Sequence, residues 1–374
     1  MNKTVKLMAV GALVLSLSTG GMVTANTGTP TVQNLSLNQS IDLALKQNPK
    51  IELAKIGVES AESGLKLANY SADQMSVERV QTYELGKLKW LNPRMAEMNV
   101  TLKKAEAELN TDLLKQDVER NYYEVLKAER MVEIKRATLQ RTKEQLKLSE
   151  ANVKAGTLAK GDLLGFQAQL AKNEAEVSSA ENQLEISLLT FNKVVGNDLG
   201  AKIKLTDRFV FEKAKDLDYN KSLKDALENN IAILKVKETL AVTEKEFEVA
   251  QKFFGTGVTA YDQAVLSRKE ADLKVKQQVQ DTSLAVKQAY LNLAAIEKSI
   301  SAYTKAVEME KENLRIYNLK YKAGLVTSVD VSGANLSLAE AEERVAQQMY
   351  QYNLLKASIK NGIFQSSSES TPQG

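Results

Sequence analysis

The chain contains no histidine and no cysteine among its 374 residues. The first absence removes the imidazole that most often serves as a general base, and the second removes disulfides and thiolate chemistry. The ligands that most zinc and copper sites need are therefore missing, and no calcium loop of the D-x-[DN]-x-[DN]-G type occurs. A Mg²⁺ or Ca²⁺ site built only from carboxylates stays open. No nucleophile–base pair has a supporting motif, so the sequence predicts a protein that is not an enzyme and that carries no cofactor.

Proline and aromatic residues are also scarce, with four prolines and 6% aromatics. This composition favours long helices over a strand-rich sandwich. Charged residues make up 26% of the chain, yet the formal net charge is only +3. A nearly neutral balance of this kind gives no argument for a nucleic-acid partner.

The first residues have the pattern of an export signal. Lys3 and Lys6 precede an apolar run at Leu7–Ser18, and a small-residue site follows at Val23–Ala25. The alternative is a membrane anchor, which needs roughly 20 unbroken apolar residues, and the run Leu7–Ser18 is shorter than that. The sequence therefore predicts a signal peptide over residues 1–25 and a mature protein that is exported to the cell envelope.

The remaining chain is a tandem duplication. The segment "VKAGTLAKGDLLG" (Val153–Gly165) matches "YKAGLVTSVDVSG" (Tyr321–Gly333) 168 positions later (321 − 153). Near the start of each half, Ser40–Pro49 resembles Ser222–Ile231 at an offset of 182 (222 − 40). Repeats of this length determine the architecture. The predicted organisation is a first helical-hairpin repeat at 26–199, a connector at 200–219, a second helical-hairpin repeat at 220–364 and a disordered tail at 365–374.

Apolar residues repeat every seven positions on both sides of each glycine turn. This spacing, kept over several heptads, indicates helices that pack as coiled coils through an apolar seam. The seam positions are Val132, Leu139, Leu146, Val153, Leu163, Leu170, Val177, Leu184 and Phe191, with their partners Ile300, Val307, Leu314, Tyr321, Val331, Leu338, Val345, Tyr352 and Ile359.

These patterns predict an all-α fold of long antiparallel coiled-coil helical hairpins in two tandem repeats. Each hairpin has one continuous arm and one broken arm, because two shorter helices laid end to end match one long helix. The expected helices are Leu37–Ala68, Arg94–Ala155, Leu158–Val195, Asn220–Lys252, Tyr261–Lys322 and Thr327–Ile363. A short strand is expected within Gly200–Lys213.

The opening "LSLNQSIDLALKQNPKI" (Leu35–Ile51), the alternating long and short helices and the paired "KAG…D" turns resemble the TolC family of outer-membrane efflux proteins. The resemblance covers nearly the whole mature chain. It implies a homotrimer whose twelve helical strands close into a hollow cylinder. It also implies two partners, a periplasmic adaptor (membrane fusion protein) and an inner-membrane pump.

The chain departs from the family at the end opposite the glycine turns, where members insert two membrane-spanning strands per hairpin. A spanning strand needs roughly 9–11 alternating residues. The connection Phe253–Thr259 is too short for two of them, and Asn69–Pro93 shows no clean alternation. We therefore expect a TolC-like α-barrel protomer without the transmembrane β-strands. Three aromatic residues lie near this end, namely Trp90, Phe253 and Phe254. They either contact a lipid surface or pack locally against one another, and the sequence leaves both alternatives open.

The resemblance assigns functional residues to the glycine turns, which in the family form the tip where the adaptor docks. The expected docking residues are Ala155, Gly156, Thr157, Leu158, Ala323, Gly324, Leu325 and Val326.

The resemblance also implies a pore constriction at Asp330, with Asp162 and Tyr321 forming a pair that holds the entrance shut. Helix capping is the alternative role for both aspartates, since a carboxylate is favoured in the first turn of a helix. The family's latch arginine is replaced by Val326, so the gate is expected to be weaker.

Two functions follow from these observations. The first is a TolC-like exit duct of a tripartite efflux or secretion system. The second is a structural coiled-coil spacer or scaffold of the cell envelope that conducts nothing. The duplicated hairpins favour the first, and the missing strands favour the second.

Overall fold

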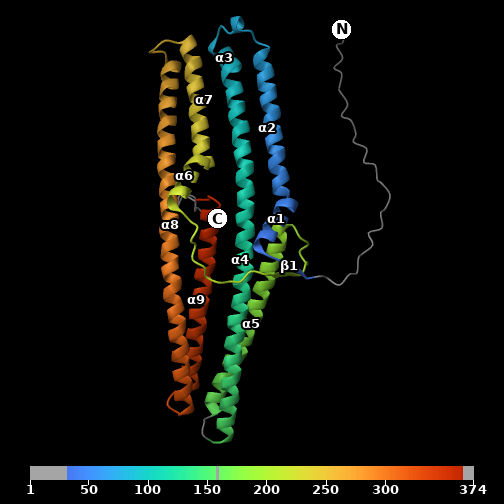
Figure 1. The fold of residues 1–374 in the computed structure, drawn as a ribbon, viewed down its shortest axis with the longest axis vertical. Helices are drawn as coiled ribbons and strands as arrows, with labels where there is room; N and C mark the ends of the chain where they lie inside the picture. Colours follow the sequence, from blue (N-terminus) through green and yellow to red (C-terminus); the bar gives the residue numbers. More distant parts are fainter. Residues whose placement is uncertain (1–31, 157–159, 365–374) are drawn as a thin grey trace, which may run out of the picture.

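The computed structural model describes residues 32–156 and 160–364, so the predicted signal peptide and tail lie outside the described residues. Helices make up most of this part (Figure 1). The helices are α1 (Leu37–Gln47), α2 (Pro49–Asp73), α3 (Tyr83–Gly86), α4 (Asn92–Lys154), α5 (Lys160–Val195), α6 (Tyr219–Asn229), α7 (Ile231–Phe253), α8 (Thr259–Lys322) and α9 (Ser328–Lys360). The strands are β1 (Gln33–Leu35) and β2 (Ile203–Leu205), and single turns of 3-10 and π helix occupy Val77–Arg79 and Lys87–Leu91.

Two long helices, α4 with 63 residues and α8 with 64 residues, run along the molecule (Figure 1). At 1.5 Å per residue each spans about 95 Å. Helix α4 packs against α2 in the upper half of Figure 1 and against α5 in the lower half, and α8 packs against α7 and α9 in the same way. The predicted pair of tandem helical hairpins is therefore confirmed.

The hairpins lie side by side because α4 also packs against α7 above and α9 below. In the upper half, α2 and α8 lie at opposite edges of the molecule (Figure 1). The two edges belong to different hairpins and present different side chains.

The predicted heptads form the seams within these hairpins. All eighteen seam positions named above are buried or half-buried. Val132, Ile300, Val331 and Tyr352 are almost fully enclosed. Because each seam is buried along its length, the seven-residue spacing is explained by coiled-coil packing.

Two predicted helices are each divided into two. The expected helix Leu37–Ala68 ends at Gln47, and a new helix begins at Pro49. Proline disfavours helical geometry in the preceding residue, and Asn48 accordingly has extended backbone angles of −78° and 123°. The expected helix Asn220–Lys252 also breaks, at Asn230, where no proline follows and the asparagine side chain caps α7.

A belt at mid-height joins the first hairpin to the connector. Strand β2 pairs in parallel with β1, which confirms the strand expected in the connector, and Leu35 lies opposite Leu205. One carboxylate oxygen of Asp207 accepts hydrogen bonds from the Leu37 backbone N–H and the Tyr122 hydroxyl, each at 2.8 Å. The Tyr122 ring is fully buried, so the connector is held firmly against α4.

Candidate functional site

Both predicted hairpin tips lie at the same end of the molecule, the lower end in Figure 1. Gly156 and Gly324 each have a φ of +74°, the left-handed geometry that closes a helix without a Cβ clash. The Leu325 N–H completes the second turn by donating to the Lys320 carbonyl at 2.9 Å. The glycines are thus explained by backbone geometry. Thr157 and Leu158 lie outside the described residues.

The described part of the tip presents apolar side chains to solvent. Leu325 is 74% exposed, and Val329 in the first turn of α9 is 73% exposed. Ala155 and Ala323 are exposed as well, whereas Val326 is half-buried against the core of the hairpins. Exposed apolar side chains gathered at one end are typical of a contact surface. Docking of an adaptor there stays a prediction.

Asp330 caps the start of α9. Its carboxylate accepts hydrogen bonds from the Thr327 backbone N–H at 2.7 Å and from the Thr327 hydroxyl at 2.8 Å. The hydrogen bond from the Thr327 backbone N–H is the main reason that the pKa of Asp330 lies below its usual range, and the hydrogen bond from the Thr327 hydroxyl adds to the shift. The residue is exposed, so the cap leaves it accessible to the surroundings of the tip. Asp330 therefore has the helix-capping role that the sequence offered as one alternative. Its role in lining a pore stays a prediction.

Tyr321 joins the two hairpins. Its ring is 4% exposed and packs edge-on against Phe166, with ring centroids 5.7 Å apart. Its hydroxyl is 2.7 Å from the Ser149 Oγ. Tyr321 belongs to α8, whereas Phe166 and Ser149 belong to α5 and α4. The side chain of Asp162, in the first turn of α5, lies outside the described part, so its predicted pairing with Tyr321 stays untested.

A buried polar contact joins the hairpins farther from the tip. The Arg141 Nε donates to the Asn335 Oδ1 at 2.6 Å, and its Nη2 donates to the Thr138 Oγ1 at 3.0 Å. The Asn335 Nδ2 donates to the Thr142 Oγ1 at 3.3 Å. Burial lowers the pKa of Arg141, although the charges of nearby glutamates oppose that shift. We call this group the Arg141 node.

The Arg141 node was not predicted from the sequence. Its only sequence signal is an asparagine at position 335 in a helix whose neighbouring positions are apolar. An asparagine side chain in a helix can also hydrogen-bond the backbone of its own chain segment. The arginine partner could therefore be found only once the register between the hairpins was known.

Lys135 makes a second tie between three helices. Its Nζ lies 2.6 Å from Glu343 of α9 and 3.2 Å from Glu176 of α5. Burial works against the charged ammonium group, but the hydrogen bonds and charges of the two carboxylates outweigh it and raise the pKa of Lys135. The two hairpins are thus fastened to each other by charged as well as apolar contacts.

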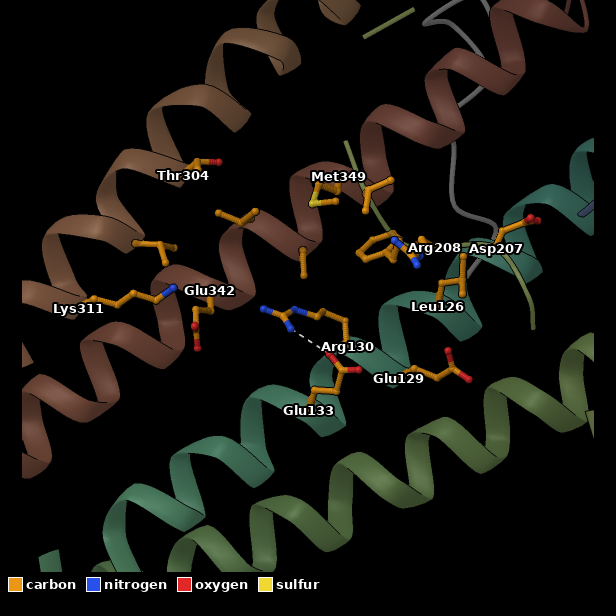
Figure 2. Close-up of a pocket in the computed structure, with 15 residues that line it drawn as sticks. Leu126, Glu129, Arg130, Glu133, Asp207, Arg208, Thr304, Lys311, Glu342 and Met349 are labelled. Carbon is orange, nitrogen blue, oxygen red and sulfur yellow. Dashed lines mark hydrogen bonds and ion pairs between the residues drawn. The ribbon is translucent and has the colours of Figure 1, made fainter. Parts of the chain in front are cut away.

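A cavity of about 470 Å³ lies where the connector passes between the hairpins (Figure 2). Its wall combines apolar side chains with charges of both signs, and Arg130 is paired with Glu133 at 2.9 Å. Burial raises the pKa of Glu129, and the Glu133 charge adds to the shift. Figure 2 shows Thr304 set apart from the labelled acidic side chains of the lining.

At the opposite end of the molecule, aromatic side chains pack against one another. The Tyr83 and Phe254 rings lie 5.1 Å apart, and the Phe253 ring packs edge-on against Tyr83 at 6.5 Å. The Lys252 ammonium lies 3.9 Å above the Trp90 ring. Local packing, one of the two interpretations of Trp90, Phe253 and Phe254, therefore accounts for these half-buried side chains.

Residues 32–156 and 160–364 contain neither a membrane-spanning helix nor a cluster of metal-ligating side chains. None of the helices there has an apolar stretch long enough to cross a membrane. Within the same residues, no three acidic side chains gather closely enough to hold a metal ion.

Both edges of the molecule carry exposed apolar stripes. On α8, Leu266 and Leu273 are seven residues apart, as are Leu284 and Leu291, so they return to one helix face. The exposed fractions of the stripe residues on α2 and α8 range from 53% to 67%. The stripes comprise Leu53, Ile56, Leu67 and Tyr70 on α2, Leu164, Ile186 and Leu189 on α5, and Leu266, Leu273, Leu284, Leu291 and Met309 on α8.

Comparison with known proteins agrees with this architecture. The sequence matches the profile of the family described as "Outer membrane efflux protein" over residues 82–197 and 248–360, more than half of the chain. The Nodulation protein T of Rhizobium leguminosarum bv. trifolii is 22% identical over 394 residues, covering 88% of this chain and 83% of that protein.

Two solved structures resemble the fold. The outer membrane protein VceC from Vibrio cholerae aligns with a TM-score of 0.72 at 15% identity, covering 87% of this chain and 95% of that chain. The CmeC outer membrane channel of Campylobacter jejuni aligns with a TM-score of 0.64 at 15% identity, covering 89% of this chain and 87% of that chain. At 15% sequence identity, the structural similarity to these two proteins shows that the chain has the same fold.

Proposed function

Because the chain belongs to the outer membrane efflux protein family, we propose that it forms the exit duct of an export system in the cell envelope. In this proposal three copies close into a hollow ring. A periplasmic adaptor docks on the tips, and an inner-membrane pump supplies the substrate. The duct performs no chemistry.

The observation that carries the proposal is the pair of unlike edges with exposed apolar stripes. Exposed apolar patches of this extent on a helix face indicate an association surface. Since one edge is α8 and the other is α2 and α5, copies associate head to tail. Head-to-tail contacts generate a closed ring when the rotation between copies permits it.

The adaptor is proposed to dock on the tip residues Ala155, Gly156, Ala323, Gly324 and Leu325. The exposed Leu325 supports this part of the proposal, because a single large apolar side chain at the end of a hairpin provides an anchor for a partner. Substituting Leu325→Asp should abolish capture of the adaptor without lowering helicity. Unchanged capture would exclude this anchor.

Asp330 is proposed to line the constriction at the tip, with Asp162 on the other hairpin as its counterpart. Both aspartates lie in the first turn of a returning helix. The exposure of Asp330 and its lowered pKa support the proposal, because they keep the carboxylate charged and accessible at neutral pH. Tyr321 is proposed to act from inside the chain, by fixing the two hairpins together near the constriction.

Substituting Leu273→Glu tests the ring. The variant places a charge in the middle of the α8 stripe, so analytical ultracentrifugation of the purified protein should show a single-chain mass where the unaltered protein shows three chains. Leu199→Glu is the matched control, since Leu199 is 57% exposed in the loop after α5 and is not one of the stripe residues. A single-chain mass for the unaltered protein would contradict the ring and favour a coiled-coil spacer.

A further inference from the structure

The cavity of Figure 2 has walls from both hairpins and from the connector. Helix α4 forms one side, α8 and α9 form the other, and connector residues 207–210 pass between them. The connector is anchored on both sides of the cavity. The Asp207 carboxylate accepts two 2.8 Å hydrogen bonds from the first hairpin, and the Ala214 N–H donates one of 2.7 Å to the Tyr352 hydroxyl of the second. The walls are therefore in place before a ligand arrives, which lowers the cost of binding.

One part of the lining is apolar and offers a surface for a hydrocarbon chain. Its side chains, all buried or half-buried, are Leu126, Phe209, Val307, Val345 and Met349. The volume of about 470 Å³ lies within the range of roughly 300–1,000 Å³ that small-molecule sites have. The cavity therefore has the size and the apolar surface of a ligand site.

Three cationic side chains reach the same space, Arg130 of α4, Arg208 of the connector and Lys311 of α8. Figure 2 shows the charged ends of Arg130 and Lys311 pointing toward each other from opposite sides. Arg130 is paired with Glu133 through its Nη1 atom alone. Within the described part of the chain, neither Arg208 nor Lys311 has an ion-pair partner. Unused cationic donors around one space favour an anion, and guanidinium groups match the oxygens of carboxylate and phosphate.

Most of the acidic side chains in the lining are engaged or turned away. Glu133 is paired with Arg130, and Asp207 accepts the two hydrogen bonds that anchor the connector. In Figure 2 the Glu129 carboxylate points away from Arg130. Glu342 lies between Arg130 and Lys311 in this view, so it is the carboxylate that faces the cations. Removing its charge should strengthen an anion site and weaken a cation site.

We propose that the cavity binds an amphipathic organic anion. Its carboxylate or phosphate head lies among Arg130, Arg208 and Lys311, and its hydrocarbon tail lies along the apolar part of the lining. The ligand contacts both hairpins and the connector of a single chain, so the proposal is independent of the ring. Because binding ties the hairpins together, it stabilises the folded chain by mass action.

Calorimetric titration of the purified protein with dodecanoate tests the site. Dodecyltrimethylammonium is the matched probe, since it has the same tail and the opposite charge, and both probes are kept below their micelle concentrations. Dodecanoate should bind at one site per chain. The ammonium compound should bind at least about tenfold more weakly, because it brings a like charge to the cations.

Charge variants test where the head binds. The variant Arg208→Gln, Lys311→Gln should weaken dodecanoate binding roughly ten- to twentyfold, since an exposed charge contributes up to about fivefold. Both side chains are exposed, so the fold should be preserved. The matched control Arg79→Gln, Lys322→Gln removes two exposed charges at the two ends of the molecule and should leave binding unchanged. Glu342→Gln should tighten dodecanoate binding by up to about fivefold.

A brominated dodecanoate locates the tail, because bromine quenches a tryptophan that it contacts. The chain has one tryptophan, Trp90, which lies next to α3 at the upper end of Figure 1. A chain with Trp90→Phe and Phe209→Trp should lose fluorescence as the ligand binds. The unaltered protein is the matched control and should keep its fluorescence.

Each other outcome overturns the proposal. Equal binding of the two probes, or full binding of dodecanoate by Arg208→Gln, Lys311→Gln, would assign the amphiphile to the exposed apolar stripes. Tighter binding of dodecyltrimethylammonium would make the cavity a site for cations. Quenching in the unaltered protein, with none in the chain with Phe209→Trp, would place the ligand at the end of the molecule that carries Trp90.

Discussion

Removing the Asn335 side chain should weaken the fold through the Arg141 node. Asn335 is 6% exposed and accepts a 2.6 Å hydrogen bond from the Arg141 guanidinium. A hydrogen bond to a charged group contributes about 1.5–3 kcal/mol. The two bonds that Asn335 donates, to Thr142 and to the Thr138 carbonyl, are both long at 3.3 Å and add little. Asn335→Ala should therefore lower the free energy of unfolding by about 2–3 kcal/mol.

Urea unfolding followed by helical circular dichroism measures this change by linear extrapolation. The matched controls are Arg141→Met and the double variant, which removes both partners. If the node acts as described, the double variant should lose less than the sum of the single variants, with a coupling of about 1–2 kcal/mol. Additive losses, or an Asn335→Ala loss within about 0.5 kcal/mol of zero, would refute the role given to the node.

Three further predictions concern single residues. Burial raises the pKa of Glu119, although Asn361 donates a 2.8 Å hydrogen bond to its carboxylate. The Glu119 carboxyl group therefore binds a proton more readily in the folded protein than in the unfolded chain. As the pH falls from 7 towards 4.5, the free energy of unfolding of the unaltered protein should rise relative to that of Glu119→Gln. A difference between the two free energies that does not change with pH would contradict this. Tyr321→Phe should cost about 1 kcal/mol in urea unfolding through loss of the hydroxyl contact with Ser149, and no loss would show that this contact is unimportant. Gly324→Ala should cost roughly 1–2 kcal/mol from its left-handed backbone alone, and a larger loss would mean that contacts at the tip also matter.

The hairpins could be predicted from sequence because their determinants are local. A seam residue packs against partners on a helix joined to its own by a short turn, so the seven-residue spacing is sufficient to indicate the fold. The glycine turns were predictable for the same reason, since a left-handed helix end requires little beyond glycine itself. The break at Asn48 was overlooked although its signal, the following Pro49, is present in the sequence.

The contacts between hairpins could not be predicted in the same way. Arg141 and Asn335 are 194 residues apart, and the register between their helices depends on packing along the whole interface. Tyr321 was predicted as a seam residue and as a gate residue, but the pattern did not identify Phe166 of the other hairpin as the ring that it packs against.

Electron microscopy of the purified protein, viewed end-on, tests the central claim most directly. A duct of three copies predicts a ring of helices around an open lumen, with the α8 edge of each copy against the α2 and α5 edge of the next. A solid bundle without a lumen, or particles the size of one chain, would contradict the account.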